Sequence, residues 1–219
     1  MKNTKAVVFD LDGVLLDTEG YQWQAWVEVL KPLGVALPRE ESFKYSGKHG
    51  TIIEEEIIKK YNLNAARGSL LEKKEKLVTE WFSSKKLELM PYAKESLEFF
   101  SARLPLAVAS SGPREEVLLK LERSNLLHFF STVVSGSEVA RGKPFPDIYL
   151  LAVKKLGATP QECISFEDTQ FGVESAKSAG LTCFAVPNAF SRAQDFSKAD
   201  KVFKSLKEAV EAIINENLR

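Results

Sequence analysis

The sequence predicts an α/β fold, in which a parallel sheet with crossover helices carries an inserted helical bundle. Two observations predict it. From about residue 104 onward, short runs of apolar and β-branched residues alternate with helical stretches, which is typical of a parallel sheet. One similar run stands near the N-terminus, and the interval between it and the next run carries only helical periodicity.

Five short apolar runs are the predicted strands. They are AVVF at 6–9, LAVAS at 106–110, TVVS at 132–135, ISF at 164–166 and CFAV at 183–186. The residues between them carry helix start and stop signals. Pro113 and Pro146 suit first-turn positions, Gly157 and Gly180 suit C-terminal caps, and Thr-Pro-Gln-Glu at 159–162 has the pattern of a capping box.

The interval between the first two strands is predicted to be a helical cap domain. Its apolar residues recur at helical spacing, as in Trp23, Trp26 and Leu30. We therefore expect a Rossmann-like core at 1–16 and 91–219 and a cap at 17–90, with hinges near 16–18 and 90–91. The three tryptophans, including Trp81, all fall in the cap. Such rings predict bundle core, with one ring facing a substrate as the alternative.

Composition excludes several classes of protein. The 30 basic residues balance the 30 acidic ones, which favours neither nucleic acid nor an anionic membrane as a partner. The first apolar run is far too short for a signal peptide or a membrane span. We expect a cytoplasmic monomer in which Cys163 and Cys183 are reduced core thiols.

The candidate site residues follow the predicted strands or open the helices after them. They are Asp10 and Asp12, then Ser110, Ser111 and Gly112, then Lys143, then Glu167 and Asp168. In open α/β sheets, ligands bind at the carboxyl edge of the strands, where these segments converge. Four carboxylates at one edge would repel each other and raise one another's pKa unless a cation lies between them. Hard oxygen ligands favour Mg²⁺ over zinc.

The other residues at this edge suit an anion. Lys143 supplies a positive charge, the Ser110 hydroxyl supplies a hydrogen bond, and backbone amides follow at Ser111 and Gly112. These features together predict a phosphate site. A turn in the cap, Gly47-Lys48-His49-Gly50, either presents cations to the distal part of a substrate or is simply a solvated turn, and the sequence leaves both open.

The ordered set Asp10 with Asp12, Ser110, Lys143, and Glu167 with Asp168 resembles the four motifs of the haloacid dehalogenase superfamily. The segments GKPFPDIYL and FEDTQFGVESAKSAG are especially similar to the branch with β-phosphoglucomutase and sugar-phosphate phosphatases. The position of the helical insert also matches the cap of that branch.

The resemblance implies a mechanism. Asp10 would be the nucleophile that accepts the phosphoryl group, and Asp12 the general acid and base. Mg²⁺ would bind Asp10, the backbone carbonyl of Asp12 and Asp168, with Glu167 either a ligand or a partner of one. The expected function is a Mg²⁺-dependent phosphatase for a small phosphate ester, such as a sugar phosphate.

Two alternatives remain. In a β-phosphoglucomutase-type mutase the phosphoaspartate returns its group to a sugar phosphate, but Gln22 stands where such mutases carry a histidine. Gly50 aligns where they carry a phosphate-binding arginine. Both departures favour hydrolysis. A non-catalytic protein that binds a phosphorylated metabolite is the other alternative, and the intact pair Asp10 and Asp12 argues against it.

Overall fold

A single parallel sheet forms the centre of the molecule. The computed structural model describes residues 3–217, and within them six strands run in the order β3-β2-β1-β4-β5-β6. They are β1 (Ala6–Phe9), β2 (Leu106–Ser110), β3 (Thr132–Ser135), β4 (Cys163–Glu167), β5 (Thr182–Ala185) and β6 (Lys201–Val202). The five predicted strands are confirmed to within one residue at either end. The short edge strand β6 was not predicted.

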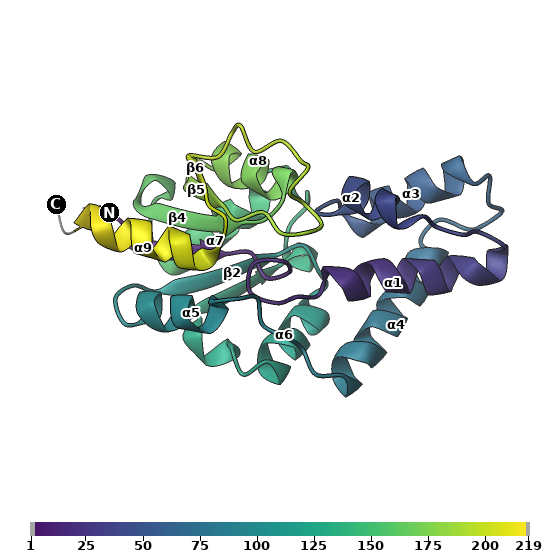
Figure 1. Cartoon of the computed structure of the whole chain (residues 1–219), viewed down its shortest axis with the longest axis horizontal. Coiled ribbons are helices and arrows are strands. Elements are labelled where there is room, and N and C mark those ends of the chain that lie inside the picture. Colours follow the sequence, from purple (N-terminus) through teal and green to yellow (C-terminus); the bar gives the residue numbers. More distant parts are fainter. Residues whose placement is uncertain (1–2, 218–219) are drawn as a thin grey trace.

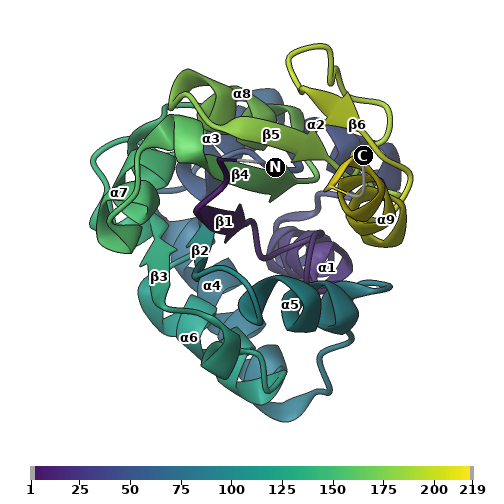
Figure 2. The same cartoon turned by 90° about the vertical axis from the view of Figure 1, so that its left-hand side faces the viewer.

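Alternate residues of the strands pack against helices on the two faces of the sheet. Val7 and Phe9 of β1 belong to one core, with α5 (Ala93–Ser101), α6 (Arg114–Arg123) and α9 (Leu206–Asn217). Ala6 and Val8 belong to the other core, with α7 (Asp147–Leu156) and α8 (Gln170–Ser178). Figure 2 shows the two helical layers around the sheet. This alternation is the two-residue period of a strand that is buried on both faces.

The predicted helix signals were mostly confirmed. A capping box is present at 159–162, where it begins a short 3-10 helix, and Gly157 closes α7 in the left-handed region with φ 68°. Gly180 follows the end of α8 with φ 90°. Pro113 and Pro146 are corrected by one position, because they precede the first turns of α6 and α7 as N-caps.

Helices fill the interval between β1 and β2, as predicted. They are α1 (Glu19–Leu30), α2 (Ser42–Tyr45), α3 (Gly50–Lys60) and α4 (Ser69–Ser84), and Figure 1 shows them together beyond one end of the sheet. Trp26, Ile57 and Leu70 are buried in a core of their own, with Trp23 packed against it. Trp81 packs against a second small cluster. The exact domain boundaries at 16–17 and 90–91 stay a prediction.

The helices α1 to α4 are called the cap below. The chain enters and leaves the cap through two segments that lie side by side. Asp17 N donates to Glu88 O at 3.0 Å, and Met90 N donates to Leu15 O at 2.9 Å. A paired entry and exit brings both connections to one place, where a single hinge can act.

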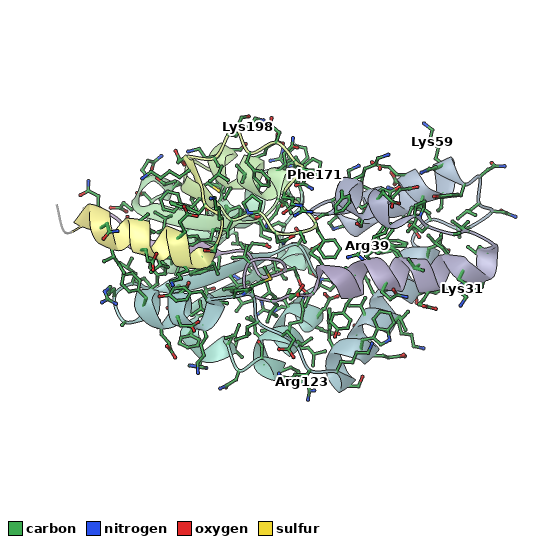
Figure 3. All side chains as sticks on the ribbon, in the orientation of Figure 1. Lys31, Arg39, Lys59, Arg123, Phe171 and Lys198 are labelled. Carbon is green, nitrogen blue, oxygen red and sulfur yellow. The ribbon has the colours of Figure 1, made fainter. Side chains whose placement is uncertain are left out.

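The charged residues and the two cysteines lie where the composition leads us to expect them. Lys59, Arg123 and Lys198 are exposed and point outward (Figure 3). Within residues 3–217, no helix is long and apolar enough to cross a membrane. Cys163 and Cys183 are buried and free, as predicted. The monomeric state, the cytoplasmic location and the lack of nucleic-acid partners stay predictions.

Candidate active site

Asp10 lies at the centre of the carboxyl edge because β1 is flanked by β2 and β4. Register pairs Phe9 with Phe166, so that the residues that follow them, Asp10 and Glu167, are neighbours. Lys143 reaches between them. Its ammonium lies 2.6 Å from Asp10 Oδ1 and 2.5 Å from Glu167 Oε1. The three side chains therefore form one buried ionic cluster.

Burial dominates the electrostatics of this cluster. It raises the pKa of Asp10 to about 8 against the opposing attraction of Lys143, with repulsion from Glu167 adding to the rise. Burial alone would lower the pKa of Lys143, but attraction to the two carboxylates raises it above its ordinary value. One lysine thus leaves this carboxylate cluster short of positive charge.

The spare negative charge suits a metal ion. One oxygen from each of Asp10, Glu167 and Asp168 lies within 4.8 Å of the others. Asp168 Oδ2 accepts from Asn188 Nδ2 at 2.7 Å, whereas Asp168 Oδ1 is the buried side-chain oxygen that has no hydrogen-bond partner among the described residues. Such an orphaned acceptor is costly unless a ligand satisfies it. Burial and repulsion from Asp10 also raise the pKa of Asp168 well above its ordinary value. The oxygen donors fit Mg²⁺.

Glu167 is occupied differently. Its Oε1 accepts from Lys143 and, at 2.6 Å, from the Tyr149 hydroxyl, and its Oε2 accepts from the backbone of Asp168. Of the two roles that the resemblance implied, these bonds favour Glu167 as the group that holds Lys143 rather than as a metal ligand.

Asp12 has a separate set of partners. Lys120 Nζ lies 2.7 Å from both of its carboxylate oxygens, and the Thr18 hydroxyl donates to Oδ1. The Ser110 hydroxyl lies 3.4 Å from Oδ2. Burial would raise the pKa of Asp12, but the charge of Lys120 and the hydrogen bonds from Lys120 and Thr18 hold it below its ordinary value. The two aspartates of the first motif therefore lie in opposite electrostatic environments.

A cavity of about 320 Å³ lies between the sheet edge and the cap. Most of the predicted site residues line it: Asp10, Asp12, Ser111, Gly112, Lys143 and Asp168 from the core, and Lys48 and His49 from the cap. Ser110 and Glu167 do not line the cavity and lie buried behind it. Trp23 and Trp26 line it too, although both pack in the core of the cap and Trp26 is buried.

The cap turn at 47–50 lines the cavity, and the side chains of Lys48 and His49 already have partners within the cap. Lys48 Nζ lies 2.6 Å from Glu56 Oε1, and His49 begins α3 by accepting from Thr51 N. His49 also lies against Gly142, where an added Cβ would come within 3.2 Å of its ring. The turn is thus a contact between the cap and the loop that carries Lys143.

Further contacts hold the cap against the core. Gln194 Nε2 donates to the carbonyls of Phe43 at 3.3 Å and Ser46 at 3.2 Å. Gln22 Nε2 donates to Glu116 Oε1 at 3.0 Å, while Lys74 donates to Gln22 Oε1. The cavity is therefore bounded by residues far apart in the sequence.

Several residues of the site were not predicted from the sequence. They are Thr18, Glu116, Lys120, Tyr149 and Asn188. Only the Glu116–Lys120 pair leaves a sequence signal, since opposite charges four residues apart on a helix attract each other. That spacing is common on exposed helices and carries no mark of burial.

The chain is similar in sequence and in structure to several known proteins. A family model described as haloacid dehalogenase-like hydrolase matches residues 7–186. A phosphorylated carbohydrates phosphatase of Thermotoga maritima is 36% identical over 182 residues, which are 81% of this chain and 82% of that protein. A β-phosphoglucomutase of Bacillus subtilis is 29% identical over 220 residues, covering 97% of this chain and 94% of that one. A structure of a CbbY variant from Rhodobacter sphaeroides in complex with xylulose-1,5-bisphosphate superimposes with a TM-score of 0.81, at 26% identity over 92% of this chain and 94% of that one.

Proposed function

The chain belongs to the haloacid dehalogenase-like hydrolase family, and from that premise we propose that it is a Mg²⁺-dependent phosphatase of a small phosphorylated carbohydrate. The proposal rests on one observation: two aspartates that have different charged partners line the same cavity. Asp10 lies beside Lys143 and the acidic cluster, and Asp12 lies beside Lys120. One is placed to attack phosphorus and the other to move protons.

In the first step, an oxygen of Asp10 forms a bond to phosphorus as the bond from phosphorus to the leaving oxygen breaks. Asp12 gives a proton to that oxygen from its protonated form, which is the minor form in the free protein because Lys120 lowers the pKa of Asp12. In the second step, Asp12 removes a proton from a water molecule that attacks the phosphorylated Asp10. Inorganic phosphate leaves and Asp10 is restored.

The surrounding residues offset negative charge. Lys143 holds Asp10 in place and faces the phosphoryl group, while the backbone amides at Ser111 and Gly112 lie at the edge of the cavity. Mg²⁺, when bound by Asp10, Asp168 and the backbone carbonyl of Asp12, would neutralise charge on the phosphoryl oxygens. Alignment and charge neutralisation account for most catalysis in phosphoryl transfer.

The relatives and the cavity support a sugar phosphate as the substrate class. One relative is named a phosphorylated carbohydrates phosphatase, and another was solved with a sugar bisphosphate. The cavity combines the rings of Trp23 and Trp26 with the polar groups of Glu19, Gln22 and Lys74. Apolar rings and hydrogen-bonding groups in one enclosed site suit a polyhydroxylated ligand.

Two observations favour a phosphatase over a mutase, although one relative is named a β-phosphoglucomutase. The side chain of Gln22 is held by Glu116 and Lys74 and has no group that can take up a proton near neutral pH. Gly50 offers no cation, and a Cβ there would lie 2.6 Å from Leu71 Cδ1. Neither position supplies what the resemblance associates with return of the phosphoryl group to a sugar.

A screen of phosphorylated sugars, nucleotides and glycolytic acids tests the proposal, with free phosphate and isomerised product measured in the same reactions. Mg²⁺-dependent phosphate release, lost in Asp10→Asn, is the expected result. Isomer formation with little free phosphate would identify a mutase. Tight binding of a phosphorylated metabolite without turnover would identify a non-catalytic binding protein.

A further inference from the structure

Helix α6 carries a lysine that is fully buried beside the proposed acid and base. The relative exposure of Lys120 is 0%, whereas Lys59 and Lys198 are exposed. Lysine is almost never fully buried unless its charge is paired. Lys120 Nζ donates to both oxygens of Asp12 at 2.7 Å and to Glu116 Oε1 at 2.9 Å.

These bonds define the orientation of the Asp12 carboxylate. Lys120 contacts both oxygens, and the Thr18 hydroxyl contacts Oδ1. The Asp12 side chain keeps an exposed fraction of 18% and lines the cavity. A general acid must lie within hydrogen-bond reach of the leaving oxygen, and an error of about 1 Å is enough to weaken such a site.

Glu116 fixes the lysine in turn. It lies one helical turn before Lys120 on α6 and is 4% exposed. Its Oε1 also accepts from Gln22 of the cap. Lys120 therefore lies between two carboxylates, of which one faces the cavity and the other contacts the cap.

We propose that Lys120 is a positioning residue that holds the carboxylate of Asp12 toward the leaving oxygen, with Glu116 holding Lys120 in place. This inference rests on the proposed function, because it assigns Lys120 a part in the proton transfers of Asp12. A purely structural ion pair would stabilise the fold without affecting those transfers selectively.

Substrates with different leaving groups separate the two roles. The test compares kcat/KM of Lys120→Met on an alkyl phosphate and on p-nitrophenyl phosphate, because kcat/KM reports the steps up to loss of the leaving group. An alkoxide needs a proton, whereas p-nitrophenolate leaves with little help. General acid catalysis contributes about a hundredfold or more to such steps. Lys120→Met should therefore lower kcat/KM at least tenfold more on the alkyl ester than on the aryl ester.

The values of kcat provide a second readout. Hydrolysis of the phosphorylated Asp10 needs Asp12 as a base for every substrate. On the aryl ester, Lys120→Met should therefore lower kcat while kcat/KM stays close to normal, so that KM falls. Lys120→Arg keeps the charge and the donors and should restore part of the difference between the esters.

Control variants keep loss of folding apart from loss of positioning. Lys177→Met removes another ion-paired lysine, which lies on α8 and pairs with Asp200, and it should leave kcat/KM on both esters unchanged. Glu116→Gln combined with Lys120→Met removes one of the two carboxylates that would otherwise lose their cation. If Lys120→Met alone does not fold, this double variant and Lys120→Arg carry the comparison.

A double-mutant cycle gives the decisive outcome. In an Asp12→Ala background, Lys120→Met should lower kcat/KM on the alkyl ester by less than twofold, because the group that it positions is gone. Equal losses on both esters, or a full further loss in the Asp12→Ala background, would overturn the inference. Failure of the proposed function is a different result, since the wild-type protein would then release no phosphate from either ester.

Discussion

The Lys143 ammonium lies 2.6 Å from Asp10 Oδ1, although 133 positions separate the two residues in the chain. Lys143→Ala removes the cation that faces both the nucleophile and the incoming phosphate. Loss of one such charge contact in the transition state costs about 3 kcal/mol, or about a hundredfold in kcat. Steady-state phosphate release at saturating Mg²⁺ measures it. A kcat within threefold of the wild-type value would remove Lys143 from the site.

Removal of Mg²⁺ should make stability depend on pH. Burial and nearby carboxylates raise the folded-state pKa of Asp10 to about 8. The folded protein therefore holds this proton more tightly than the unfolded chain does. The resulting contribution to the free energy of unfolding is present at acid pH and is lost as pH rises from about 4 to 8. Thermal unfolding in EDTA should therefore occur at lower temperature at pH 8 than at pH 5.

Mg²⁺ should remove most of this dependence by neutralising the cluster. At a concentration 100 times its Kd, it should also raise the free energy of unfolding by about 2.7 kcal/mol. Asp168→Asn is the matched variant, because it removes one buried charge and one ligand. It should stabilise the EDTA-treated protein and abolish the Mg²⁺ shift. A wild-type melting temperature unchanged by Mg²⁺ at every pH contradicts the metal site.

Gly13 should tolerate no side chain. Its φ is 82°, and an added Cβ would lie 2.2 Å from Asp168 Oδ2. Gly13→Ala should displace Asp168, lower Mg²⁺ affinity at least tenfold and destabilise the fold by about 1–3 kcal/mol. Gly34→Ala is the control, since its φ of 75° is similar but no atom lies within 4 Å of its Cβ. It should cost about 1 kcal/mol and leave Mg²⁺ affinity unchanged. Equal Mg²⁺ affinities in the two variants would argue against the role of Gly13.

Tryptophan fluorescence should report ligand binding in the cavity. Trp23 and Trp26 line it, whereas Trp81 packs elsewhere in the cap. We expect the cap to close over the cavity when Mg²⁺ and a phosphate mimic bind. This closure should alter the tryptophan emission and reduce quenching by solutes, because it excludes water from the rings. Trp81→Phe should keep this response, and the double variant Trp23→Phe with Trp26→Phe should lose it. The reverse pattern would place the ligand outside the cavity.

The main features of the site could be predicted because they depend on local pattern and parallel pairing. AVVF and ISF have the composition of buried strands, and the polar residues after such strands meet at one edge of a parallel sheet. Asp10 and Glu167 are neighbours for that reason alone. The helical nature of the cap was also predictable, because Trp23, Trp26 and Leu30 recur with helical spacing.

The rest depends on packing between segments that are distant in the chain. Lys120 and Glu116 belong to REEVLLKLER, which has the composition of an exposed amphipathic helix. Lys120 is buried because α6 packs against both α4 and the loop that carries Asp12, which lies 108 positions away. Asn188 lies in a loop with no regular period, and β6 has only two exposed residues. Apart from the spacing of Glu116 and Lys120, none of these features leaves a signal in local sequence.

The most direct test of the central claim is the mass of the protein after rapid quench with a good leaving-group substrate or acetyl phosphate. Asp12→Ala keeps the nucleophile but lacks the base that activates water, so its phosphorylated form should accumulate. Fragmentation should place one added phosphoryl group on Asp10, and Asp10→Asn should acquire none. A label on a serine, or continued turnover by Asp10→Asn, would contradict the proposed mechanism.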